Sequence, residues 1–182
     1  MPLDADLKRA IVRLPEKEKD KLLLRLITKD ALLTERLQFE LIEHGQTVSE
    51  RRDAIREFAD RTVVHYHDAA KWMLADMRTV AGYITRHVKV TKDKYGDVEL
   101  TLYMLNSFFD HHTDLLRHFN SRTEKAALYI AKRTEQLLKK LNKLDPDYYV
   151  EFDADVNRLL ERVHRYAPAH YARQLGLPAR WG

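Results

Sequence analysis

Histidine and aspartate recur three residues apart in two stretches of the chain, a spacing that places both side chains on one face of a helix. The first stretch contains His65 and Asp68. The second contains His111 and Asp114, with His118 one helical turn further on. Imidazole nitrogens and carboxylate oxygens are common ligands of divalent transition metals. These five residues are therefore the candidate metal ligands.

The second stretch nevertheless points away from the expected core. On an ideal helix its polar side chains lie within an arc of about 100°, opposite the apolar stripe that contains Leu105 and Phe109. A metal site in a helix bundle is built from inward-facing ligands. We therefore favour a solvated polar face and expect no bound cofactor. His112 falls inside the apolar stripe, and we expect it to be a core or rim histidine with a hydrogen-bond partner.

A second pattern consists of carboxylates alone. Glu40 and Glu43 lie three residues apart, and Glu57 and Asp60 repeat that spacing further along the chain. The pattern resembles the Glu-x-x-Glu…Glu-x-x-Asp motif of the all-α nucleotide pyrophosphatases, the MazG-like and dimeric dUTPase group. The resemblance covers only these two short segments. It implies an enzyme that holds Mg²⁺ on four carboxylates and hydrolyses a nucleoside triphosphate with a metal-activated water.

The other interpretation of these carboxylates is that they are ordinary solvated groups of a highly charged chain. The short connection at residues 45–47 favours it. An antiparallel hairpin there would set Glu43 near Ser49, roughly 12 Å from Glu57 along the helix axis. The enzyme is therefore an alternative, and we favour a chain without catalytic activity.

Lysines form a third pattern at a spacing of four or seven residues. Lys125, Lys132, Lys139 and Lys143 share one face of the helix expected after residue 121, opposite its apolar stripe. Such a ridge could follow a phosphate backbone, which makes weak nucleic-acid binding a further alternative. No aromatic side chains interleave with the lysines, so stacking on a single strand is unsupported. A solvated outer helix face is the favoured explanation.

The composition indicates long amphipathic helices. Hydrophobic residues make up 45% of the 182 positions and charged residues 33%, whereas only 5 Gly and 5 Pro are present. The absence of cysteine excludes disulfides and thiolate metal sites. The net charge of +4, from 32 basic and 28 acidic residues, permits nucleic-acid binding without arguing for it. No apolar run approaches the ~18 residues of a membrane span. We expect a soluble cytoplasmic protein of bacterial origin.

Several common enzyme classes are excluded by missing motifs. The chain has no Gly-x-Gly-x-x-Gly, no Gly-Lys-Ser/Thr loop and no Gly-x-Ser-x-Gly elbow. Dinucleotide binding, P-loop phosphate chemistry and α/β-hydrolase catalysis are therefore not expected.

The longest apolar periodicity runs over residues 51–88 and predicts one helix about 55 Å long if it is unbroken. Its members recur every three or four residues. They are Ile55, Phe58, Ala59, Thr62, Tyr66, Ala69, Met73, Met77, Val80 and Ile84. Such a helix needs neighbours along its length, so we predict an all-α fold, an antiparallel bundle of long helices over residues 47–167.

Shorter elements flank this bundle. Residues 1–46 read as short amphipathic helices with Leu-rich stripes, packed on the main domain, with Asp30 as an N-cap. Ser121 to Glu124 is a capping box, and Asp145-Pro146 is a second helix start. Residues 168–182 form a tail. Two alternatives stay open for residues 86–103: a small β-hairpin, or the favoured helix–loop–helix.

The function that best fits these observations is a non-enzymatic module for protein–protein interaction or self-assembly. The polar faces contain no convergent catalytic group, and amphipathic surface exceeds what the motifs explain. The Leu-rich segment within residues 1–46 is the leading interaction surface. The expected partner is another protein or a second copy of the chain, and no membrane is expected to be involved.

Overall fold

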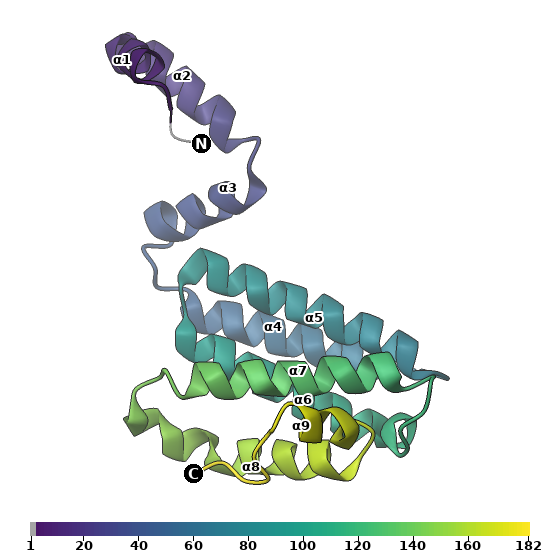
Figure 1. Ribbon diagram of the computed structural model, residues 1–182. Coiled ribbons are helices and arrows are strands. Elements are labelled where there is room, and N and C mark those ends of the chain that lie inside the picture. The colour runs from purple at the N-terminus through teal and green to yellow at the C-terminus, as the bar shows by residue number, and fades with distance from the viewer. Residues whose placement is uncertain (1–2) are drawn as a thin grey trace. The chain divides into compact units, whose positions relative to one another are not determined.

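The computed structural model describes residues 3–182 and confirms the all-α fold class. Within these residues every regular element is helical, so the β-hairpin alternative for residues 86–103 is not seen. The chain divides into two compact units, one ending at Gly45 and the other spanning Gln46–Gly182 (Figure 1).

The first unit consists of short helices. They are α1 (Ala5–Arg13), α2 (Glu16–Ile27), α3 (Ala31–Leu37) and a π-helical turn (Gln38–Ile42). Asp30 is the expected N-cap, since its carboxylate accepts from the backbone N–H groups of Leu32 and Leu33. Helices α1 to α3 contain no buried residue, and Phe39 is the buried side chain that follows them.

The second unit contains the long helices and a continuous apolar core. Its elements are α4 (Val48–Val63), α5 (Ala70–Thr91), α6 (Lys94–His112), a 3₁₀ turn (Thr113–Leu116), α7 (Glu124–Leu141), a second 3₁₀ turn (Pro146–Tyr148), α8 (Tyr149–Arg165) and α9 (Ala169–Gln174). Figure 1 shows α4 to α8 lying alongside one another. Helix α6 contacts α4, α5, α7 and α8, and is therefore the central element of this unit.

The sequence of α6 explains its central place. Its buried residues lie all around the helix rather than along one stripe, and include Val98, Leu102, Leu105, Phe108 and Phe109. A helix that is apolar on every side has to be enclosed by neighbours. The other long helices bury one face each.

The single helix predicted over residues 51–88 is wrong, because the chain breaks between Val63 and Ala70. Residues 62–68 read Thr-Val-Val-His-Tyr-His-Asp, a run of weak helix formers. Ala69 is extended, with φ −150° and ψ 145°, and α5 packs back on α4. Tyr66, expected in the buried stripe, is 91% exposed. The apolar spacing continues across the turn at residues 64–69, so the spacing alone does not show that the chain reverses there.

Other helix boundaries follow the sequence closely. Helix α5 ends at Thr91, and its C-cap Lys92 adopts the left-handed conformation with φ 61°. The helix predicted to follow a capping box at Ser121 begins later, at Glu124, because the Asn120 side chain accepts from the N–H groups of residues 122 and 123. Asp145 is confirmed as a cap, and its Pro146 opens a 3₁₀ turn that leads into α8.

The start of α6 is fixed by one buried carboxylate. Asp93 accepts hydrogen bonds from the Gly96 N–H at 2.9 Å, from Arg52 Nε of α4 at 2.7 Å, and from His87 Nε2 of α5 at 3.0 Å. A Cβ on Gly96 would overlap the Asp93 carboxylate and lie 2.9 Å from Arg52 Nε, so only glycine fits there. Burial would raise the pKa of Asp93, but these three hydrogen bonds outweigh it and lower the pKa from 3.8 to about 2.

Replacing Asp93 with asparagine is expected to remove a stabilisation that depends on pH. A carboxyl whose pKa is lower in the folded state stabilises the fold above its unfolded pKa, and this stabilisation is lost as the pH falls through the folded value. The lowered pKa of Asp93 corresponds to about 2 kcal/mol, lost between about pH 5 and pH 2. Urea unfolding over this range should give a flatter profile for Asp93→Asn than for the parent.

The matched control is Asp53→Asn, which changes an exposed carboxylate of α4. It should retain the steep acid limb of the parent profile. Identical pH profiles for the two variants would contradict the role assigned to Asp93.

Candidate functional site

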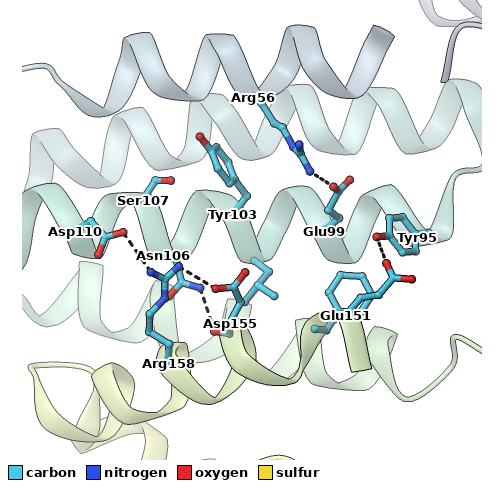
Figure 2. Close-up of a pocket in the computed structure, with 12 residues that line it drawn as sticks. Arg56, Tyr95, Glu99, Tyr103, Asn106, Ser107, Asp110, Glu151, Asp155 and Arg158 are labelled. Carbon is cyan, nitrogen blue, oxygen red and sulfur yellow. Dashed lines mark hydrogen bonds and ion pairs between the residues drawn. The ribbon is translucent and has the colours of Figure 1, made fainter. Parts of the chain in front are cut away.

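A polar cleft of about 420 Å³ lies where α6 meets α4 and α8 (Figure 2). Its lining residues are Arg56, Tyr95, Glu99, Leu102, Tyr103, Asn106, Ser107, Asp110, Glu151, Phe152, Asp155 and Arg158. Most of them project from one face of α6, so the helix that fills the core also forms the floor of the cleft.

Most charged side chains of this cleft lie beside a group of opposite charge, whereas Arg56 Nε and Glu99 Oε2 are buried without a hydrogen bond to any described residue. Arg56 of α4 bonds to Glu99 of α6, and Arg158 Nη2 lies 3.0 Å from Asp155 Oδ1 (Figure 2). Asp110 is bonded by Arg162, a residue of α8 outside the lining. The pairs of Arg56 with Glu99 and of Arg162 with Asp110 join different helices, whereas Arg158 and Asp155 lie one turn apart on α8.

Two tyrosine hydroxyls complete the polar network. Tyr95 donates to Glu151 at 2.6 Å, and Tyr103 donates to Asp60 of α4. Burial raises the pKa of both tyrosines, and the carboxylate that each one faces raises it further. The hydroxyls therefore stay protonated at neutral pH and donate to these carboxylates. Both hydrogen bonds connect α6 to a neighbouring helix, Tyr95 to α8 and Tyr103 to α4.

Histidines gather at the break between α4 and α5. His65 Nδ1 donates to Asp76 Oδ2 at 2.9 Å, and His67 Nε2 lies 3.3 Å from the same oxygen without hydrogen-bond geometry. The His67 side chain is only 7% exposed, and its ring centroid is 4.9 Å from that of His112. His112 Nε2 donates to the Val63 carbonyl at 2.7 Å, which confirms the expected hydrogen-bonded core histidine.

The structure brings some of the candidate metal ligands together. His65, His111 and Asp114 line one pocket of about 410 Å³ at this break, whereas Asp68 lines a neighbouring pocket. His118 is exposed in the loop before α7 and lines neither of them. Across residues 3–182, no group of three or more histidine or acidic side chains is arranged to hold a metal ion.

The four carboxylates of the pyrophosphatase-like pattern are divided between the two units. Glu40 belongs to the first unit and accepts from Arg36 at 2.7 Å, and Glu43 ends the π-helical turn of that unit. On α4, Glu57 lies 4.0 Å from Arg61, and Asp60 accepts from a tyrosine of α6. The Mg²⁺-dependent pyrophosphatase stays a prediction of the sequence pattern alone.

The lysines of α7 are placed on its outer side. Lys139 pairs with Glu135 and Lys132 is exposed, whereas Lys143, predicted on the same helix face, lies in the turn after α7, which ends at Leu141. Lys125 lines a pocket shared with the start of α5. Weak nucleic-acid binding by these lysines stays a prediction.

Sequence reasoning missed an aromatic side chain beside these lysines. The Tyr129 ring lies under two guanidinium groups, Arg78 of α5 at 5.7 Å and Arg133 at 5.8 Å. It also missed Arg52, whose contact with Asp93 joins residues 41 positions apart. The one local signal for this contact was Asp93 three residues before Gly96, the spacing of an N-cap.

Comparison of the chain with protein-family models, with curated proteins and with solved structures finds no match. Within residues 3–182, no helix is long and apolar enough to cross a membrane.

The histidine cluster is expected to make stability depend on pH near neutrality. Burial lowers the pKa of His112 below its usual 6.5, although its hydrogen bond to Val63 opposes the shift. A histidine that is harder to protonate when folded stabilises the fold above pH 6.5, and this contribution is lost as the pH falls below that value. The free energy of unfolding should therefore decrease from pH 7 to pH 5, and His112→Gln should reduce the slope.

Glutamine retains a donor for the Val63 carbonyl, and His118→Gln at an exposed position serves as the control. Urea unfolding measured at half-unit pH steps gives the slopes. If the two variants changed the slope equally, the effect would not belong to the buried histidine.

Proposed function

We propose that the protein is a non-enzymatic interaction module. In this proposal Gln46–Gly182 is an antiparallel bundle of long helices, and the short amphipathic helices of residues 3–45 bind another protein or a second copy of the chain. The polar cleft of the second unit supports the non-enzymatic part, because its charged groups and hydroxyls already engage one another.

The observation that carries the proposal is the uncovered apolar surface of the first unit. Large exposed apolar side chains occur on each of its helices and on the π-helical turn. They are Leu7, Val12, Leu23, Leu24, Leu26, Leu33, Leu41 and Ile42, and Leu3 just before α1 is exposed as well. Exposed apolar side chains that gather into patches mark interaction sites, and nine of them within one short segment are the basis of this proposal.

The lengths of these helices lead to the same conclusion. Helices α1, α2 and α3 contain 9, 12 and 7 residues, which is marginal for a helix that stands alone in water. Helical segments of this size gain their stability by packing an apolar face. A single buried phenylalanine provides little of that packing, so a partner surface is the natural source of the rest.

Replacing leucines of this surface with aspartate is expected to abolish association. Leu24→Asp combined with Leu41→Asp replaces two exposed apolar side chains, and both residues belong to the first unit. Each buried leucine contributes about 2 kcal/mol to an interface, so each change should weaken binding more than tenfold. Sedimentation velocity over a wide concentration range measures self-association, and tagged capture from nuclease-treated lysate measures a foreign partner.

Lys17→Asp provides the control, since Lys17 is an exposed polar residue of the same segment. This variant should associate as the parent does. A parent that stays monomeric at every concentration and retains no protein from lysate would refute the proposal.

A further inference from the structure

The second unit contains a pocket whose charges are not neutralised. It has a volume of about 800 Å³ and is lined by the first turns of α5, by residues 114–123 and by the first turn of α7. Four basic side chains line it: Lys71 and Arg78 from α5, Arg122 from the preceding loop, and Lys125 from α7. Helices α5 and α7 both begin at this pocket, so their partial positive ends add to the same field.

These four side chains have no carboxylate partner among the described residues. Lys71 Nζ lies 4.6 Å from the Trp72 ring centroid, and Arg78 lies over Tyr129, but neither forms an ion pair. Arg122 and Lys125 likewise have no ion pair within the described part of the chain. This differs from the cleft between α4, α6 and α8, where the charged side chains are paired.

The acidic groups of the pocket do not cancel its charge. Asp114 is held by Arg117 at 2.6 Å, which leaves Asp68 as the unpaired carboxylate of the lining. Asn120, Ser121 and Thr123 add polar groups to the wall. A concave site with an excess of cations concentrates anions more strongly than a flat basic surface does.

We propose that this pocket binds a small molecule that carries at least two phosphate groups. Guanidinium groups match phosphate oxygens in bidentate geometry, and ammonium groups add charge. Lys71 and Arg78 are seven residues apart, about 10 Å along the axis of α5, which exceeds the reach of one phosphate. The volume lies in the range of small-molecule sites. The proposal is independent of the interaction function assigned to residues 3–45.

Calorimetric titration of the full chain tests the proposal, with inorganic phosphate, pyrophosphate and ATP as separate probes and no divalent metal present. Pyrophosphate and ATP should bind more tightly than phosphate, because each of them carries more than one phosphate group. Arg78→Gln and Arg122→Gln should each weaken binding about tenfold. Asp68→Asn should strengthen it, because it removes a repulsive charge. Trp72, beside Lys71, gives a second readout by fluorescence.

Lys132→Gln is the matched control, since it removes one charge from the exposed side of α7 outside the pocket. It should leave the affinity within twofold of the parent. The altered side chains are exposed, and urea unfolding checks that each variant is folded.

Three results would overturn the proposal. The first is the absence of binding by any probe at millimolar concentration. The second is an equal loss of affinity in Arg78→Gln and Lys132→Gln. The third is a nucleic-acid duplex that binds more tightly than ATP and whose binding is weakened by Lys132→Gln. This result would place the anion-binding site on the outer face of α7.

Discussion

The arrangement of the second unit depends on how one buried carboxylate is satisfied. Removing Asp93 from water is unfavourable, and three donors from three segments of the chain compensate for it. Because one of these donors is the Gly96 N–H, the same carboxylate caps α6, the helix that every other long helix contacts. Arg52 and His87 then hold α4 and α5 against its first turn. A change at Asp93 would leave Arg52 without its closest acceptor at that helix start.

The two sides of this unit use charge in different ways. Between α4, α6 and α8, cations and carboxylates face one another across helices, as with Arg56 and Glu99, so their fields cancel. Beside the first turns of α5 and α7, four basic side chains line a pocket without an ion-pair partner in the described part of the chain, and Lys71 and Arg78 lie over aromatic rings. Paired charges fix helices to one another, whereas unpaired charges in a concavity are available to a ligand. This distinction separates a structural cleft from a binding pocket of similar polarity.

How much of this could be predicted from the sequence depends on the range of the interaction involved. Local signals were sufficient for the all-α class and for the caps at Asp30 and Asp145. The turn at residues 64–69 was missed because hydrophobic periodicity records which faces are buried and not whether the chain reverses. Contacts such as Arg52 with Asp93, or Arg78 with Tyr129, join positions more than 40 residues apart. Spacing within one helix contains no information about such pairs.

The turn at residues 64–69 contributes to two pockets, the histidine-lined pocket that contains His65 and the basic pocket that contains Asp68. If residues 51–88 formed one straight helix, Lys71 and Arg78 would lie far along its axis, beyond the reach of residues 114–123. Because the chain reverses after Val63, α5 begins beside the start of α7, and its basic residues meet Arg122 and Lys125. The reversal also places its own histidines against the end of α6, where Asp114 lines both pockets. A run of weak helix formers therefore determines which charged groups share a surface, although none of those residues is a cation of the phosphate pocket.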